Sequence, residues 1–195
     1  QMTADQIRVF SDELLRSEYR PDLPGAAVAI VYGQQSWTGA YGLRDVAARL
    51  PISTDTIIRL GSLSKQFTAA ATLQLIDQGR TSLDSSVSEI LGIESQAFQE
   101  VRIRHLLAHS SGLPPGLLQA RKNGRVHPEL GKQEVLRLIE SEPFIAQPDR
   151  EWIYSDLGYV LLGFIVEAVS GVQLEAYLEK NLFTPLVVKS PFHTK

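Results

Sequence analysis

The pattern of apolar and polar positions predicts a helix and a β-hairpin at the front of the chain. Over residues 4–19 the apolar side chains share one face of a helix, which ends before Pro21. These side chains are Ile7, Phe10, Leu14 and Leu15. Two apolar runs, 25–32 and 36–42, are separated by a turn-like Gly33-Gln34-Gln35 and predict two strands. Because a two-stranded hairpin is marginal by itself, this sheet is expected to be incomplete.

The longest predicted helix begins near Ser62 and stops at Gly79. Phe67, Ala71 and Leu75 recur every four residues along it, and no proline interrupts it. Apolar side chains surround most of its circumference, so we expect this helix to be buried.

A second buried helix follows Tyr154-Ser155-Asp156 and stops at Gly171. A turn and a short helix are expected over residues 83–91, and shorter helices over 103–108, 132–142 and 174–182, with a surface loop at 116–131. The fold class is therefore α/β in the broad sense (α+β). We expect one partial domain, with an N-terminal helix and sheet hairpin in residues 1–60 and a helical region in residues 61–195.

Composition narrows the functional classes. With 19 basic and 22 acidic residues, a net charge of −3 and a pI near 5.8, the chain has no electrostatic footprint for nucleic acid. It has no cysteine, which excludes disulfides, thiolate catalysis and Cys-based zinc sites. No phosphate-cradling or dinucleotide-binding glycine motif is present, and we expect no cofactor.

Membrane and targeting signals are not evident in the sequence. No apolar run approaches the roughly 18 residues of a membrane span, and the N-terminus lacks the basic-then-apolar layout of a secretory signal. We expect no membrane span. The compartment stays open, being periplasmic or secreted if a signal peptide has been removed and cytoplasmic otherwise.

Ser62 and Lys65 are the first candidate catalytic pair. In a helix they lie one turn apart on the same face, so the lysine amine can reach the serine hydroxyl. A lysine whose pKa is lowered can take the proton of a serine and activate it as a nucleophile. The start of the helix favours the negative charge that develops in acyl transfer. The spacing alone is common, and its alternative interpretation is a serine-rich cap followed by an exposed lysine.

Tyr154 is the third candidate. A phenol held beside a lysine can have a lowered pKa and can carry the proton of the nucleophile to a leaving group. The alternative is a core tyrosine followed by Asp156 as the N-cap of the next helix.

Several segments, in this order, resemble the penicillin-recognising serine hydrolases, which include class C β-lactamases, D-alanyl-D-alanine carboxypeptidases and related esterases. The segments are residues 24–29, 55–62, 65–69, 103–114 and 154–163. The resemblance covers roughly residues 20–190. It implies a β-lactamase/transpeptidase-like fold, of which this chain holds the N-terminal hairpin of the sheet and the helical region while the C-terminal strands are absent.

The same resemblance assigns roles to the candidate residues. It implies that Ser62 is the acylated nucleophile, Lys65 its partner, and Tyr154 the general base for acylation and for activating the deacylating water. Asp156 stands where the family usually has asparagine and is implied to bind substrate. A carboxylate accepts hydrogen bonds but does not donate them, so recognition of a substrate amide would differ. Asp156 would also hold Lys65 charged.

The implied substrate is a small-molecule amide or ester, namely a β-lactam, a D-Ala-D-Ala peptide or a small ester, and the sequence does not choose among them. The family also carries a downstream Lys-Thr-Gly or His-x-Gly motif that supplies the second oxyanion donor. Lys122-Asn123-Gly124 precedes Tyr154, and His193-Thr194-Lys195 lacks the glycine, so we interpret both as coincidences.

Loss of one oxyanion donor costs about 10²–10³ in rate. We therefore expect the 195-residue form to be impaired, with its missing strands supplied by a second chain or fragment. The alternative function is a catalytically inactive binding or regulatory module that keeps the fold.

His105 and His109 are four residues apart, which is a spacing that can bind a metal on a helix. No third ligand is evident, and we favour a loop-fixing role for His109 and no metal.

Overall fold

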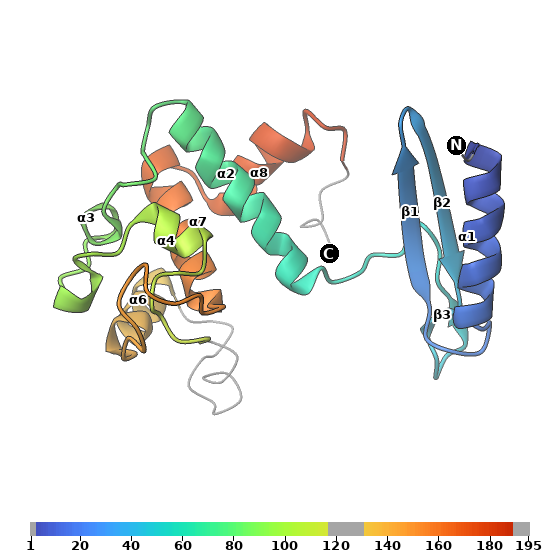
Figure 1. Ribbon diagram of the computed structural model, residues 1–195, viewed down its shortest axis with the longest axis horizontal. Coiled ribbons are helices and arrows are strands. Elements are labelled where there is room, and N and C mark those ends of the chain that lie inside the picture. Colours follow the sequence, from blue (N-terminus) through green and yellow to red (C-terminus); the bar gives the residue numbers. More distant parts are fainter. Residues whose placement is uncertain (1–2, 117–130, 189–195) are drawn as a thin grey trace. The chain divides into compact units, whose positions relative to one another are not determined.

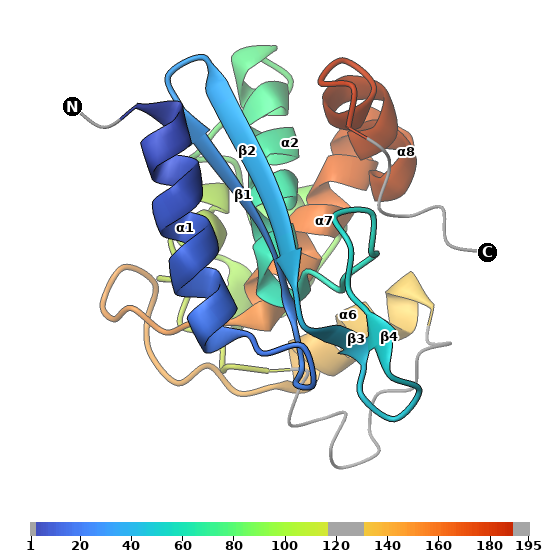
Figure 2. The ribbon, with the colours of Figure 1, turned by 90° about the vertical axis from the view of Figure 1, so that its right-hand side faces the viewer.

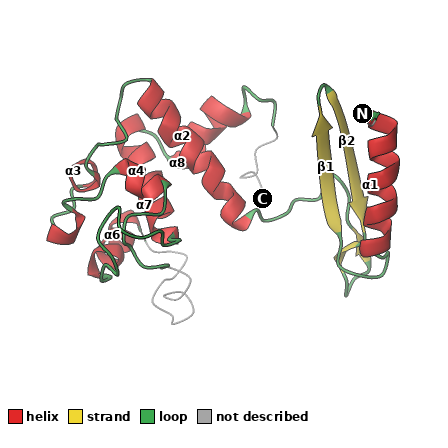
Figure 3. Cartoon of the chain, in the orientation of Figure 1, coloured by secondary structure: helices red, strands yellow, loops and turns green. Residues whose placement is uncertain are grey.

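In a computed structural model of the chain, residues 3–116 and 131–188 are described (Figure 1). They fall into two compact units that divide between Arg59 and Leu60. Strands occur in the first unit, whereas the described part of the second is built of helices and loops (Figure 3). The mixed helix-and-strand class expected from the sequence is confirmed. The surface loop predicted at 116–131 lies almost wholly outside the described residues, as do Lys122-Asn123-Gly124 and His193-Thr194-Lys195.

The first unit places helix α1 (Ala4–Glu18) along a hairpin (Figure 2). Strands β1 (Ala26–Tyr32) and β2 (Gln35–Tyr41) pair antiparallel, and Gly33, at a φ of 62°, begins the two-residue turn between them. The phenol of Tyr41 donates a hydrogen bond of 2.8 Å to Asp12 of α1. The predicted hairpin and N-terminal helix are therefore both present, and a partly buried hydrogen bond joins them.

The packed face of α1 differs from the predicted one. Phe10 is 60% exposed and Leu14 50%, whereas Ser11 is buried. The apolar face predicted for this helix is therefore only partly covered within this unit. The helix packs mainly against β2, and a single strand covers only a narrow strip of a helix.

Two short strands follow the hairpin, in a segment where the sequence pattern predicted none. Strands β3 (Leu43–Asp45) and β4 (Leu50–Pro51) pair antiparallel after the chain turns at Gly42, where φ is 77°. Backbone hydrogen bonds from Leu43 to Leu23 and from Gly25 to Leu43, each 2.8 Å, hold the turn against the entry to β1. Strands of three and two residues are too short to show the alternation of apolar and polar side chains by which strands are predicted.

The second unit begins with a 3₁₀ turn, η1 (Gly61–Ser64), that leads into helix α2 (Lys65–Asp77). The sequence prediction of a single helix from Ser62 is corrected in this respect. Gly79, at a φ of 69°, follows the end of the helix as predicted. The helix is buried along one face that includes Ala71 and Leu75, whereas Leu73 is 46% exposed. The sequence pattern therefore overestimated how much of the circumference of α2 is buried.

Helix α7 (Asp156–Ser170) is the centre of this unit. Its buried side chains are Leu157, Leu161, Leu162, Ile165 and Val166. It packs against helices α2, α3 (Val87–Leu91), α4 (Ile103–Leu107), α6 (Lys132–Ser141) and α8 (Leu174–Leu178). The short turns η2 (Gln96–Phe98) and η3 (Glu179–Phe183) complete the described elements. Because α2 and α7 share this core, their first turns are held beside one another.

No single described helix has the length and apolar composition of a membrane span. Helix α7 and the segment from Leu174 to Phe183 meet that criterion only as a pair, bent by 74°.

Gly112 fixes the loop that runs beside the start of α7. Its φ is 79°, and a Cβ added there would overlap the carbonyl oxygen of Ala146. The carbonyl of Gly112 accepts a hydrogen bond of 2.9 Å from the backbone of Ile145. Gly79 has a similar φ of 69° but open space around it.

The two glycines therefore give a matched test of packing. We expect Gly79→Ala to cost about 1–2 kcal/mol because of its left-handed backbone alone. We expect Gly112→Ala to lower the free energy of unfolding by about 1–3 kcal/mol more than Gly79→Ala, because the new methyl group must displace the Ala146 backbone. Urea unfolding followed by far-UV circular dichroism measures both losses. Equal losses for the two variants would contradict the packing of this loop.

Candidate active site

The structure brings Ser62, Lys65 and Tyr154 together. The Nζ atom of Lys65 lies 3.3 Å from the Oγ atom of Ser62. The phenol of Tyr154 donates a hydrogen bond of 2.7 Å to the same Oγ atom. Tyr154 precedes α7 by two residues, so contact with Ser62 joins segments 92 residues apart. All three candidates from the sequence thus meet at one hydroxyl.

The 3₁₀ turn explains why Ser62 and Lys65 meet. In a 3₁₀ helix the side chains at positions i and i+3 eclipse one another, more closely than in an α-helix. Gly61, at a φ of 54°, starts the turn, and the hydroxyl of Ser64 donates a hydrogen bond of 2.7 Å back to the Gly61 carbonyl. The turn therefore aligns the nucleophile candidate with the lysine.

Lys65 forms an ion pair with Asp156. The two side chains are 2.6 Å apart and are 17% and 21% exposed. Burial alone would lower the pKa of Lys65, but hydrogen bonds with Asp156 and Tyr154 outweigh it and raise that pKa above its ordinary value. Lys65 is therefore a cation at neutral pH, as expected from the carboxylate at position 156.

Asp156 is the first residue of α7, and Ser155 is the N-cap. The alternative that Asp156 is a simple N-cap is therefore wrong. Its carboxylate crosses to α2 and pairs with Lys65.

Tyr154 lies in the field of that cation. The Lys65 Nζ atom is 5.0 Å from the centre of the Tyr154 ring. Lys65 first, and the hydrogen bond with Ser62 second, hold the pKa of the Tyr154 phenol below its ordinary value against a smaller opposing effect of burial. Tyr154 is also 37% exposed, so the alternative of a core tyrosine is wrong.

The two histidines have separate contacts. His105 is buried, accepts a backbone hydrogen bond from Arg102 at 3.1 Å, and lies 2.9 Å from Asp149 through its other ring nitrogen. His109 instead accepts the backbone N–H of Ser155 at 3.2 Å. Among the described residues, no group of three or more His, Asp or Glu side chains could hold a metal ion.

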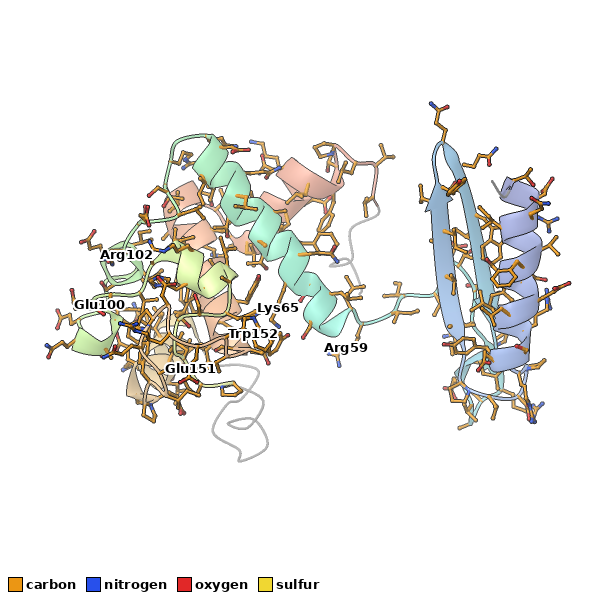
Figure 4. All side chains as sticks on the ribbon, in the orientation of Figure 1. Arg59, Lys65, Glu100, Arg102, Glu151 and Trp152 are labelled. Carbon is orange, nitrogen blue, oxygen red and sulfur yellow. The ribbon has the colours of Figure 1, made fainter. Side chains whose placement is uncertain are left out.

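His109 and Trp152 are the site residues that sequence reasoning did not place. The ring of His109 lies 4.6 Å from that of Tyr154, and Trp152 lies 6.4 Å from Tyr154. Figure 4 shows Lys65 and Trp152 near the start of α2. The loop-fixing role expected for His109 did not identify the segment around Tyr154 as its partner.

A cavity of about 420 Å³ lies beside Lys65 and Asp156, between helices α2 and α7. Its walls include Thr68, Phe164 and Glu167. Glu167 also pairs with Lys132 at 3.4 Å. The cavity offers a partly apolar space next to the ion pair.

A serine hydroxyl within hydrogen-bond reach of a lysine and a phenol has neighbours that can activate it as a nucleophile. The Beta-lactamase family model matches residues 12–195, so the chain belongs to that family. This confirms the resemblance found in the sequence motifs.

Its relatives include both penicillin-binding proteins and esterases. The chain is 30% identical over 181 residues to penicillin-binding protein 4 of Amycolatopsis lactamdurans. The aligned region covers 89% of this chain and 45% of that protein. It is 34% identical over 178 residues to esterase EstB of Burkholderia gladioli. This aligned region covers 82% of this chain and 45% of that protein.

A solved structure confirms the expected β-lactamase/transpeptidase-like fold. The octameric penicillin-binding protein homologue from Pyrococcus abyssi matches with a TM-score of 0.79 and 34% identity, over 95% of this chain and 43% of that chain. The chain thus spans less than half the length of these relatives.

The charge of Lys65 should control the acidity of Tyr154. We expect Lys65→Met to raise the pKa of the Tyr154 phenol, because the cation that favours the phenolate is removed. The measurement is a ¹³C NMR titration of ring-labelled tyrosine, with Tyr154→Phe identifying the resonance. Lys132→Met is the matched control, since Lys132 pairs with Glu167. A Tyr154 resonance that titrates at the same pH in all forms would refute the coupling.

Proposed function

We propose that this protein is a serine hydrolase that cleaves an ester or amide through an acyl-enzyme on Ser62. The observation that carries the proposal is the 2.7 Å hydrogen bond between Tyr154 and Ser62, made beside a lysine that carries a positive charge. The family of the chain, which includes penicillin-binding proteins and an esterase among its relatives, supports the same reaction class.

Tyr154 is the proposed general base. As a phenolate it takes the proton of Ser62 while the Oγ atom forms a bond to the substrate carbonyl carbon, and the carbonyl π electrons move to the oxygen. When that intermediate collapses, the bond to the leaving group breaks and Tyr154 returns the proton to it. Tyr154 then activates a water that hydrolyses the acyl-enzyme and frees Ser62.

Lys65 acts as a fixed cation in this scheme. Its raised pKa leaves no free electron pair at neutral pH, so it cannot take the proton of Ser62 there. It instead stabilises the phenolate of Tyr154, and Asp156 keeps it in place at 2.6 Å. The start of α2 favours the developing oxyanion through the helix dipole.

Asp156 has a second proposed role in substrate binding. It lines the cavity between α2 and α7, where a bound substrate would meet a carboxylate in place of an amide. An ionised carboxylate accepts hydrogen bonds only, so it would bind an N–H of the substrate and not a carbonyl. The substrate class proposed is a small amide or ester, and β-lactams, D-Ala-D-Ala peptides and small esters are the members to assay.

The partner proposed for this chain is a set of further strands. The sheet of β1 and β2 has two strands in the described part of the chain, and such a sheet is marginal by itself. A second chain or fragment that adds strands would complete the sheet and supply the second oxyanion donor expected for the family. Where this donor is absent, turnover should be low.

Covalent labelling tests the nucleophile directly. We expect a fluorescent fluorophosphonate or a fluorescent penicillin to label Ser62, with the site read by peptide mass spectrometry. Ser62→Ala should lose the label, whereas Ser64→Ala should keep it, because the Ser64 hydroxyl is bonded to the Gly61 carbonyl. Labelling without any turnover of nitrocefin or p-nitrophenyl esters would favour the inactive binding module. Absence of labelling, or labelling elsewhere, would refute the proposal.

The rate of labelling should depend on pH through Tyr154. Because the phenolate is the proposed base, the rate should rise with pH by about tenfold per unit until it levels off above the lowered pKa of Tyr154. In Lys65→Met the same rise should move to higher pH, since the pKa of Tyr154 is then no longer lowered by the cation. A rate independent of pH would contradict the assignment of Tyr154 as the base.

A further inference from the structure

His109 holds Tyr154 at three points. Its carbonyl oxygen accepts the backbone N–H of Ile153 at 2.8 Å. Its Nδ1 atom accepts the backbone N–H of Ser155 at 3.2 Å. Its ring lies against that of Tyr154, with the ring centres 4.6 Å apart and the planes tilted by 35°. His109 therefore binds the backbone N–H groups of the residues before and after Tyr154, and its ring packs against the Tyr154 side chain.

The backbone of His109 makes this grip possible. Its φ is 57°, in the left-handed region that side-chain-bearing residues rarely adopt. This turn follows helix α4 directly, and the backbone N–H of Ser110 bonds back to the carbonyl of His105 at 2.9 Å. The strained conformation is retained at a position that contacts a candidate base, which is where such strain is commonly found.

The hydrogen bond to Ser155 requires a neutral imidazole. The Nδ1 atom accepts a proton-bearing N–H, so in this state it carries no proton of its own, and the ring proton is on Nε2. If His109 gained a second proton, its Nδ1–H would face the N–H of Ser155 with two donors opposed. The contact would then break on the side of Tyr154 that leads into α7.

The charges around His109 favour its neutral form. Burial first, and the Lys65 cation second, lower the pKa of His109, and Asp156 opposes them. The phenols of Tyr154 and Tyr159 also pack against the ring, at 4.6 and 5.1 Å. On α4 itself, Arg104 and His105 both contact Asp149.

We propose that neutral His109 is the positioning residue for Tyr154, and that its protonation at low pH withdraws Tyr154 from Ser62 and stops acylation. The proposal rests on the proposed function, because it concerns the base of that reaction. His109 itself takes no part in proton transfer to the substrate. It acts by keeping the phenolic oxygen within hydrogen-bond reach of the Ser62 hydroxyl.

Two substitutions separate the contributions of His109. Asparagine and glycine both tolerate the left-handed backbone, so neither should unfold the turn. His109→Asn keeps a carbonyl acceptor near the place of Nδ1 but does not titrate and lacks the ring. His109→Gly lacks the acceptor as well. We expect the rate of Ser62 labelling at neutral pH to fall on the order of 10- to 100-fold in His109→Gly, and less in His109→Asn.

The pH dependence gives the decisive readout. Below the pKa of His109 two groups must both be deprotonated, so the labelling rate should fall by about a hundredfold per pH unit in place of about tenfold. His109→Asn should keep the tenfold slope throughout. The pH at which the slope changes should equal the midpoint of the His109 ring resonance, measured by NMR on the same protein.

His105→Asn is the matched control, because His105 anchors Asp149 on the same loop without contact to Tyr154. It should leave the steep acid slope in place. A tenfold slope at all pH values in the unsubstituted protein, equal rates for the Asn and Gly variants, or loss of the steep slope in His105→Asn would each overturn the proposal.

An NMR titration distinguishes failure of the proposed role of His109 from failure of the proposed function. The ¹³C resonance of Tyr154 should show a second inflection at the pH where His109 titrates, and His109→Asn should lack it. If no probe labels Ser62, the proposed function fails while this inflection still decides the link between His109 and Tyr154. If labelling occurs but the inflection is absent, His109 is not the positioning residue.

Discussion

The ion pair between Lys65 and Asp156 is the constraint on which the site depends. It joins the first turn of α2 to the first turn of α7 across 91 residues of sequence, with the two side chains largely buried. Breaking such a pair by removing one partner leaves a partly buried charge without compensation. Because the pair fixes Lys65 as a cation, it also decides which neighbour of Ser62 can act as a base. In the proposed mechanism these charges favour the phenol of Tyr154 over the amine of Lys65 as the base.

The hydrophobic core fixes the helices that carry Lys65 and Asp156. Helix α7 buries Leu161, Leu162 and Ile165 completely, and it packs against α2 and α4 at the same time. A close-packed interior resists small displacements, so the helix that carries Asp156 is fixed relative to the one that carries Lys65. Helix α4 in turn leads into the turn at His109, which holds the segment before α7. The core therefore positions each of the groups around Ser62 through a different helix.

Much of this could be predicted from the sequence, and the misses have physical causes. Helix periodicity, with a proline after α1 and glycines after α2 and α7, located these three helices because such signals are local. The pairing of Tyr154 with Ser62 is long-range, and it was anticipated only through resemblance to a family. The 3₁₀ turn and the pairing of β3 with β4 depend on backbone hydrogen bonds that leave no side-chain pattern. The contacts of His109 with the segment around Tyr154 depend on its own left-handed backbone conformation. A single histidine in a sequence does not predict that conformation.

Aspartate at position 156 has a consequence beyond the charge of Lys65. An asparagine amide could accept from Lys65 and donate to a substrate at once, whereas the carboxylate has no proton to donate. At 2.6 Å from the Lys65 amine, one carboxylate oxygen is already engaged. In the proposed reaction, a substrate carbonyl would then be bound by other groups, such as backbone N–H donors near the start of α2. The same substitution that strengthens the cation beside Tyr154 therefore narrows the ways in which the site can hold its substrate.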